Sequence, residues 1–290
     1  MGVRLIVFCP KKGVALSSEE ARMIVKMLEE RVEGRVVVDL GLRETYVKAR
    51  GGYVELEGSK LPLDELREIA ERGGDYVYFL RGGMLERVAF YVSGRFYKLR
   101  WLGEGVAPTL EISGIHMHNI VGTDPWSDAL RKVRLARVRR GMVVLDICTG
   151  LGYTAIHSAR RGAYVVTIEK DPLVLEVAEY NPWSRGLAML NITAILGDAT
   201  DVVREMPSSV FDAAVHDPPR LALAGELYSE DFYADLNRVL KRGATLFHYT
   251  GAPGKRLGKD VQRGVVRRLE RAGFRVVQVL KGYGVVAMKD

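Results

Sequence analysis

The chain has 290 residues, a formal net charge of +7 and an apolar fraction of 48%, enough to bury a core in one large or two medium domains. No apolar run is long enough to span a membrane, and the N-terminal residues lack the apolar length and cleavage site of a signal peptide. Two cysteines are too few for a disulfide framework, so we expect a cytoplasmic protein. Two glutamines and four asparagines, against many arginines and glutamates, are typical of a thermophile.

The charge is unevenly placed along the chain. Residues 1–125 hold 18 basic and 18 acidic side chains, so the whole net charge of +7 lies in residues 126–290. Six of the ten residues 131–140 are basic. Such a run is either a solvated helix face or a stripe that contacts phosphates. The basic second part favours a polyanionic partner such as RNA, and a merely solvated surface is an equal alternative.

Residues 1–104 are predicted to form a small α+β domain. Helix patterns begin after Ser17 or Ser18 and at Leu63. The expected helices cover 17–33 and 63–70, and the expected strands cover 3–8, 36–38, 46–47, 53–56, 76–80, 89–92 and 96–101. No catalytic constellation stands out here, so we expect an accessory domain that helps to hold RNA.

Residues 105–125 form a connecting segment with an unusual share of polar side chains. His116 and His118 lie two residues apart, and Asp124 follows them. A His-x-His pair can bind a metal ion only with further ligands, and the sequence shows no convincing set. We therefore expect no metal site.

Residues 126–290 alternate strand-like apolar runs with helix patterns, which is typical of a mostly parallel α/β sheet. The expected helices cover 127–140, 153–161, 171–180, 199–206, 229–240 and 258–273. The expected strands cover 142–147, 164–169, 192–197, 211–216, 244–249, 275–280 and 284–288. The last two flank a tight turn, so they pair as an antiparallel hairpin. Ligands of such sheets bind at the carboxyl ends of the strands.

The stretch 142–163 predicts a nucleoside site. Asp146 lies near the end of an apolar strand, and the turn Thr149-Gly150-Leu151-Gly152 precedes a helix. A glycine-rich turn brings backbone N–H groups and a helix N-terminus against a ligand. Glu169, at the end of the next strand, can accept from both hydroxyls of a ribose. The glycine spacing also fits a dinucleotide fingerprint, but Asp146 would repel a pyrophosphate and could instead hold an ammonium group.

Four motifs follow one another at these strand ends, and with them the chain resembles the class I S-adenosylmethionine-dependent methyltransferases. They are DICTGLGYTA from Asp146, Glu169, Gly197-Asp198-Ala199 and His216-Asp217-Pro218-Pro219-Arg220. The first and last also resemble a group of predicted archaeal methyltransferases with an extra N-terminal domain. The resemblance covers residues 126–290. It implies a doubly wound, Rossmann-like, mostly parallel seven-stranded sheet that ends in an antiparallel hairpin.

The resemblance also implies roles for the cofactor residues. Thr149, Gly150 and Gly152 would cradle the methionine part of S-adenosylmethionine, and Asp146 would reach its ammonium group directly or through water. Glu169 would bind the ribose. Asp198, followed by Ala199, would bind the adenine amine.

Asp217-Pro218-Pro219-Arg220 is the expected catalytic turn. In the family this motif marks methyl transfer to a planar amino nitrogen, whose lone pair is delocalised. The Asp217 carboxylate and the Pro218 carbonyl can both accept its N–H bonds and aim the lone pair at the methyl group. Pro219 keeps the turn rigid. Arg220 stands where the family has an aromatic residue, and its guanidinium can stack on a base or meet phosphate.

The sequence thus predicts methyl transfer to an exocyclic amine in RNA, with cytosine N4 of ribosomal RNA first and adenine N6 second. Side chains expected to face the substrate are His116, His118, Asp124, His216, Tyr228 and His248. A protein methyltransferase acting on Gln or Lys, a polyamine aminopropyltransferase of the same fold and a non-catalytic RNA-binding module are the alternatives. The target position and the oligomeric state stay open.

Overall fold

The computed structural model describes residues 3–30, 33–251 and 258–290. The chain divides into two compact units. The C-terminal unit contains Met1–Phe8, Ser127–Pro172 and Gly186–Asp290, and the N-terminal unit contains Cys9–Trp126 and Leu173–Arg185. The two units therefore exchange short segments of chain, whereas we expected continuous domains 1–104 and 126–290.

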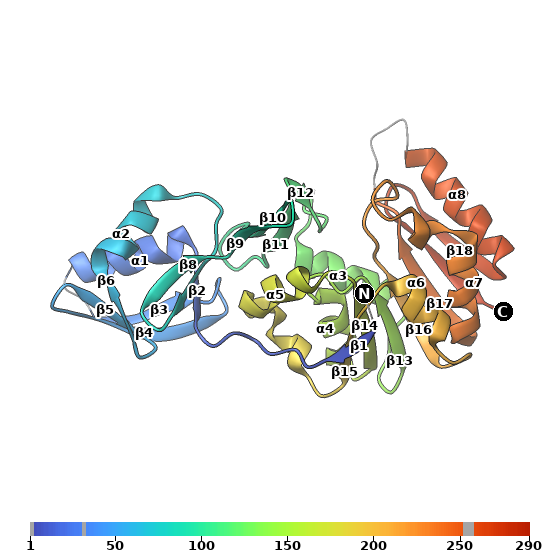
Figure 1. Cartoon of the computed structure of the whole chain (residues 1–290), viewed down its shortest axis with the longest axis horizontal. Helices are drawn as coiled ribbons and strands as arrows, with labels where there is room; N and C mark the ends of the chain where they lie inside the picture. Colours follow the sequence, from blue (N-terminus) through green and yellow to red (C-terminus); the bar gives the residue numbers. More distant parts are fainter. Residues whose placement is uncertain (1–2, 31–32, 252–257) are drawn as a thin grey trace. The chain divides into compact units, whose positions relative to one another are not determined.

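The C-terminal unit is built on one large sheet (Figure 1). Its strand order is β1-β15-β14-β13-β16-β17-β19-β18. The strands are β1 (Arg4–Ile6), β13 (Val143–Ile147), β14 (Tyr164–Glu169), β15 (Ile192–Leu196), β16 (Phe211–His216), β17 (Leu240–Tyr249), β18 (Phe274–Leu280) and β19 (Gly284–Lys289). The helices are α3 (Pro125–Leu135), α4 (Tyr153–Arg160), α5 (Pro172–Tyr180), α6 (Ala199–Glu205), α7 (Glu230–Val239) and α8 (Gly258–Arg271), with short 3-10 turns η1 (Pro182–Ala188) and η2 (Gly225–Tyr228). α3, α5 and η1 run across the boundary between the units.

The sheet is mostly parallel, as expected, and its terminal hairpin is present. The five central strands run parallel to one another, in the order β15, β14, β13, β16 and β17. By contrast, β19 pairs antiparallel with both β17 and β18. The strand count is a correction. β1 pairs antiparallel with β15, so the sheet has eight strands instead of seven. The sequence analysis assigns this segment to the first domain, because a three-residue strand carries no local sign of its distant partner.

Apolar side chains of the sheet and three helices form the core of this unit. Leu145 and Ile147 of β13 and Leu246 of β17 pack with residues of α6, α7 and α8. Figure 1 shows α7 and α8 together beside the orange and red strands. α6 begins at the N-cap Asp198 and α7 at the N-cap Ser229, whose side chains accept from backbone N–H groups of the first turn. These caps fix where each helix leaves the carboxyl end of its strand.

The helix before β13 is shorter than expected. It ends at Leu135, because Arg137 adopts a left-handed backbone with φ 58° and the chain then turns toward β13. The exposed residues Arg137, Arg139 and Arg140 therefore lie in a turn and not on a helical stripe.

In its described residues the N-terminal unit holds three small antiparallel sheets, two helices of its own and all of α5 after Pro172. The sheets have the orders β3-β4-β5-β6, β2-β7-β8 and β12-β11-β10-β9. Their strands are β2 (Val14–Leu16), β3 (Gly34–Val38), β4 (Arg43–Arg50), β5 (Tyr53–Leu56), β6 (Ser59–Pro62), β7 (Tyr78–Arg81), β8 (Met84–Arg87), β9 (Ala89–Val92), β10 (Arg95–Arg100), β11 (Thr109–Ile112) and β12 (Ile115–His116). α2 is Leu63–Arg72.

The predicted cap of the first helix is confirmed. α1 (Ser18–Glu29) begins after Ser17, whose hydroxyl accepts from the Glu20 N–H, while the Glu20 carboxylate accepts from the Ser17 N–H. We expected this helix to continue to residue 33; it ends at Glu29, and residues 31–32 lie outside the described residues. No helix in the described ranges is long and apolar enough to cross a membrane.

Replacing Leu236 by Ala tests the core of the C-terminal unit. Leu236 of α7 is fully buried in it, so the substitution should lower the free energy of unfolding by about 2–5 kcal/mol. Leu190 is fully exposed in the same unit, and its replacement by Ala should change stability by no more than about 0.5 kcal/mol. Denaturant unfolding of both variants checks this, and equal losses would contradict the packing described above.

Candidate active site

The carboxyl ends of four parallel strands meet at one edge of the sheet. Ile147 of β13 lies opposite Ile168 of β14 and His216 of β16, and His216 lies opposite His248 of β17. The residues that follow these strands are therefore neighbours, although about 100 positions separate the first strand from the last in sequence. This is the edge at which parallel sheets bind ligands.

The glycine-rich turn after β13 is tightly bent. Cys148, Gly150 and Gly152 all have positive φ angles, of 70°, 55° and 80°. The N–H groups of Cys148 and Thr149 both donate to the Ile168 carbonyl, at 3.0 Å. Gly152 also meets a close neighbour, since a Cβ atom there would lie 2.5 Å from the Leu187 side chain. Only glycine fits this position without displacing its surroundings.

Glu169 ties this turn to the next strand. Its Oε2 accepts from the Gly150 N–H at 2.9 Å, and its Oε1 accepts from the N–H groups of Lys170 and Asp171 at 2.9 and 3.0 Å. Burial raises the pKa of Glu169, and these backbone N–H groups oppose the rise. The carboxylate predicted to bind a ribose thus also holds the glycine turn in shape.

Asp146 is fully buried beneath the turn. Its Oδ2 accepts from the Thr167 hydroxyl at 2.7 Å, and the Thr167 and Thr149 hydroxyls lie 2.6 Å apart. Within the described residues its Oδ1 has no hydrogen-bond partner. Burial raises the pKa of Asp146 to about 7. A buried carboxylate oxygen without a donor fits a cationic or N–H group of a ligand.

Asp198 is engaged at both oxygens. As the N-cap of α6, it accepts through Oδ1 from the Thr200 N–H at 2.9 Å and the Thr200 hydroxyl at 2.6 Å. Its Oδ2 pairs with the Lys170 ammonium at 2.6 Å. Burial opposes ionisation, but Lys170 and Thr200 lower the pKa of Asp198 below its usual value. Ala199 begins the helix and is buried.

The turn Asp217 to Arg220 follows β16. The Asp217 N–H donates to the Ile147 carbonyl at 3.3 Å, which ties the turn to β13. The Pro219 carbonyl accepts from the Tyr228 hydroxyl at 2.9 Å. Among the described residues no group donates to the Pro218 carbonyl. Arg220 is exposed.

Lys132 is a site residue that the sequence reasoning missed. Its ammonium lies 2.6 Å from Oδ2 of Asp217 and 3.0 Å from Oδ2 of Asp128, and both Lys132 and Asp128 are 3% exposed. In the sequence, Lys132 is one of the six basic residues of 131–140, which are predicted to lie at the surface. The signal was present in the helical spacing, since Asp128 and Lys132 share a face with the buried Ala129, Val133 and Ala136.

His216 and His248 lie beneath the Asp217 turn, with ring centroids 4.4 Å apart. Nε2 of His216 lies 2.9 Å from the Leu227 carbonyl, and Nε2 of His248 lies 2.8 Å from the Tyr233 hydroxyl. Both rings are fully buried, and burial lowers the pKa of His216 to about 4 and the pKa of His248 well below its usual value. The expectation that these rings face the substrate is corrected: they are neutral core residues.

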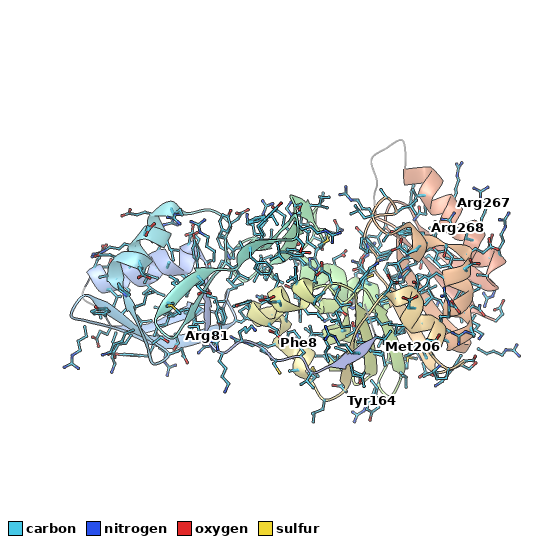
Figure 2. The ribbon with its side chains drawn as sticks, in the orientation of Figure 1. Phe8, Arg81, Tyr164, Met206, Arg267 and Arg268 are labelled. Atoms are coloured by element: carbon cyan, nitrogen blue, oxygen red, sulfur yellow. The ribbon has the colours of Figure 1, made fainter. Side chains whose placement is uncertain are left out.

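Tyr228 is also buried, and its role is to hold the turn. It is 2% exposed, its hydroxyl donates to Pro219, and its carbonyl accepts from Arg268 Nε at 2.7 Å. Figure 2 labels Arg268 on α8. The sequence placed Tyr228 against the substrate; its ring packs instead near the two histidines.

The remaining predicted substrate residues belong to the N-terminal unit. Nε2 of His116 lies 3.0 Å from Arg100 Nη1, and Nδ1 of His118 lies 2.9 Å from the Thr109 hydroxyl. Asp124 lies in the same unit. Their part in substrate binding stays a prediction. In the described part of the chain, no three His, Cys, Asp or Glu side chains come together as a metal site would require.

Solved structures share this fold. Spermidine synthase in complex with the transition-state analogue AdoDATO superposes with a TM-score of 0.52 and 17% identity, over 69% of this chain and 70% of that one. At this identity the likeness concerns the fold alone. This likeness and the mostly parallel strand order show that the chain shares the fold of that enzyme.

Sequence comparison gives the family. The chain is 48% identical over 229 residues to the uncharacterized protein MJ1233 of Methanocaldococcus jannaschii, a match that covers 78% of each. The chain belongs to the same family as MJ1233. No family model matches it.

Two methyltransferases are more distant relatives. A tRNA (uracil(54)-C(5))-methyltransferase of Pyrococcus horikoshii is 27% identical over 150 residues, 51% of this chain and 33% of that protein. MJ1649 of M. jannaschii, which carries the name of a ribosomal RNA large subunit methyltransferase, is 34% identical over 116 residues, 39% of this chain and 28% of that protein. The chain matches only about a third of each of these proteins.

Replacing Asp146 by Asn tests its raised pKa. The folded protein holds this carboxyl protonated up to about pH 7, whereas the unfolded chain releases the proton near pH 4. Between pH 5 and pH 8, the free energy of unfolding of the wild type should therefore fall by on the order of 2 kcal/mol relative to that of the Asp146→Asn variant. Thermal or denaturant unfolding of the cofactor-free protein at both pH values measures this difference.

Asp212→Asn is the matched control. Burial opposes ionisation of Asp212, but Lys241 and the Val143 N–H lower its pKa, so this carboxylate is ionised in both states above pH 5. The stability difference between wild type and this variant should be the same at pH 5 and pH 8. A flat difference for Asp146→Asn as well would refute the raised pKa.

Proposed function

We propose that this protein transfers the methyl group of S-adenosylmethionine to an exocyclic amine of a nucleobase in RNA, with cytosine N4 or adenine N6 as the target. The enzyme is an S-adenosylmethionine-dependent methyltransferase, as its fold and its methyltransferase relatives indicate. Both of those relatives carry names of RNA methyltransferases, which supports RNA as the substrate. Ribosomal RNA is the first expectation.

The strand-end residues fit this cofactor. The unpartnered Oδ1 of Asp146 suits the ammonium group of its methionine part, beside the turn that contains Thr149, Gly150 and Gly152. Glu169 would hold the ribose while keeping its bonds to the turn, and Asp198 would hold the adenine amine. When bound, the cofactor supplies a methyl group on a positively charged sulfur.

The observation that carries the proposal is the acceptor pair at the Asp217 turn. Asp217 and Pro218 follow β16 directly beside the glycine turn, and both keep an acceptor oxygen without a donor from the described residues. Two acceptors suit an amino group with two N–H bonds. By holding those bonds they localise the nitrogen lone pair and aim it at the methyl group. The Tyr228 bond to Pro219 keeps the turn in place.

An amine target also suits this chain better than a ring carbon does. Methylation at a carbon such as uracil C5 needs a nucleophile that first adds to the ring, commonly a thiolate. The sequence has two cysteines: Cys9 lies in the N-terminal unit, and burial raises the pKa of Cys148 well above its usual value. The carboxylates around Cys148 are the opposite of the electropositive surroundings of an activated thiol.

A transfer assay tests the function. Purified protein, labelled S-adenosylmethionine and total RNA from a strain lacking the gene are incubated, and the RNA nucleosides are then separated by mass spectrometry. N4-methylcytidine or N6-methyladenosine is expected. Label in protein would favour the protein methyltransferase. Transfer from decarboxylated S-adenosylmethionine to a diamine would favour the aminopropyltransferase, whose fold this chain shares.

Substitution of Asp217 separates an acceptor from a base. Asp217→Ala should lower single-turnover methyl transfer to RNA by on the order of 10²-fold or more, because one charged acceptor of the amine is lost. Asp217→Asn should be milder, because an amide oxygen still accepts a hydrogen bond. S-adenosylmethionine affinity, measured by calorimetry, should stay nearly unchanged in both. Asn as inactive as Ala would indicate proton abstraction, and full activity in Asp217→Ala would reject this turn.

The basic turn tests RNA contact. Arg139 and Arg140 precede β13, so they lie at the edge of the sheet where its parallel strands begin. Tyr164, the first residue of β14, lies at this edge and is labelled in Figure 2. β13 has five residues, so this edge is about 16 Å from the catalytic edge. These arginines could contact only the backbone that flanks the target nucleotide. Arg139 and Arg140 replaced together by Gln should reduce the slope of log affinity against log salt by about 1.5.

The matched control is Arg263 and Arg267 replaced by Gln on exposed positions of α8. This pair has the same charge and a different place on the same unit, so its slope should stay at the wild-type value. Filter-binding or fluorescence titrations over a range of salt concentrations measure both. Equal slopes in wild type and the Arg139/Arg140 variant would remove this turn from the RNA surface.

A further inference from the structure

The inner face of α3 brings a buried ion cluster to the Asp217 turn. Lys132 and Asp128 lie one helical turn apart, and each side chain is only 3% exposed. Nζ of Lys132 is 3.0 Å from Oδ2 of Asp128, 2.6 Å from Oδ2 of Asp217 and 4.1 Å from the centre of the Tyr249 ring. Burying an ammonium group is costly, so the fold must compensate it at every face.

The contacts of Lys132 occupy all three donors of its ammonium group. A lysine ammonium has three donors, and here two meet carboxylates while the third side faces the Tyr249 ring. Lys132 therefore has no donor left for a phosphate, and its two anionic partners hold it charged, which excludes a role as a base. Asp128 is held in turn, since its Oδ1 accepts from the Tyr283 hydroxyl at 2.8 Å.

Asp217 is the member of the cluster that reaches the surface. Its side chain is 20% exposed, its Oδ2 is taken by Lys132, and no described residue donates to its Oδ1. The pairing with Lys132 fixes the rotation of the carboxylate, because Oδ2 must stay near the ammonium. One oxygen is thereby directed inward and the other is left for a ligand.

We propose that Lys132 is a positioning residue of the methyl transfer: by holding Oδ2 of Asp217, it keeps this carboxylate ionised and presents Oδ1 to the target amine. The inference rests on the proposed function. A merely structural ion pair would stabilise the fold without setting the charge or the direction of Asp217.

The charged groups around Asp217 determine whether each substitution raises or lowers its pKa. Burial raises the pKa of Asp217, Lys132 lowers it and Asp128 raises it. The ionisable groups that face it come from four sides of the site: Lys132 and Asp128 of α3, Asp146 and Cys148 at the end of β13, Tyr228 of η2, and Tyr249 and Tyr283 at the ends of β17 and the hairpin. Lys132 is the cation in direct contact, so its loss leaves a buried carboxylate that favours the proton.

The first experiment compares two variants across pH. Lys132→Met keeps the length of the side chain and removes its charge, so transfer at pH 7 should fall by about 10-fold or more and recover as pH rises. Asp128→Asn should move the acid limb of the rate profile to lower pH, because it removes an anion beside Asp217. The loss in Lys132→Met should appear in kcat, with KM for RNA changed less than about 3-fold.

A double-mutant cycle then asks whether Lys132 acts through Asp217. In an Asp217→Asn background there is no carboxylate to ionise, so adding Lys132→Met should cost no more than about 2-fold. A loss as large as in the wild-type background, or an acid limb that does not move in Lys132→Met, would overturn the inference. If Lys132→Met does not fold, the test is the acid limb of the pH–rate profile of Asp128→Asn. An acid limb at the wild-type pH would then overturn the inference.

A readout without substrate keeps this test apart from the proposed function. The carboxyl ¹³C resonance of Asp217, assigned with Asp217→Asn, reports its protonation in the cofactor-free protein. It should titrate at higher pH in Lys132→Met and at lower pH in Asp128→Asn than in wild type. If wild type methylates no RNA, the proposed function fails, whereas unmoved titrations with an active wild type would refute only the role of Lys132.

Discussion

Three carboxylates lie at one edge of the sheet, Asp146 and Glu169 buried and Asp217 partly exposed, and each is compensated in a different way. Backbone N–H groups surround Glu169, a lysine ammonium holds Asp217, and hydroxyl groups serve one oxygen of Asp146. A buried charge without such partners would cost several kcal/mol. The kind of partner decides what each group can still do: Glu169 is built into the turn, whereas Asp146 and Asp217 each retain one oxygen without a donor.

The elements of the C-terminal unit were predictable because their signals are local. The apolar run of β13, the glycines after it and the cap at Ser229 each specify structure within a few residues. The pairing of β1 with β15 joins positions about 190 residues apart, and nothing in a three-residue strand encodes that partner. The same holds for Lys132, which meets Asp217 across 85 residues and reads in sequence as one more surface charge.

Polar residue types at strand ends predict the site as a region, and the structure brings these strand ends together, but they do not predict the direction of each side chain. His216 and His248 lie at or near the ends of their strands, where sequence suggests substrate contact, yet their rings are fully buried and lie against each other at an angle of 40°. Side chains alternate between the two faces of a strand, so the side chains of adjacent residues such as His216 and Asp217 point in opposite directions. Deciding which one faces the ligand requires the position of η2, whose Leu227 carbonyl meets His216.

The pairing of Asp217 with Lys132 also bears on which amine suits the site. A protonated diamine or lysine seeks a carboxylate as a counter-ion, but here the ammonium of Lys132 already lies 2.6 Å from that carboxylate and would repel a second cation. A nucleobase amine is neutral and needs only an acceptor for its N–H bonds. Oδ1 of Asp217 remains an acceptor while its charge is balanced within the protein. The arrangement therefore favours a neutral planar amine, and the acidic strand ends do not by themselves indicate a polyamine pocket.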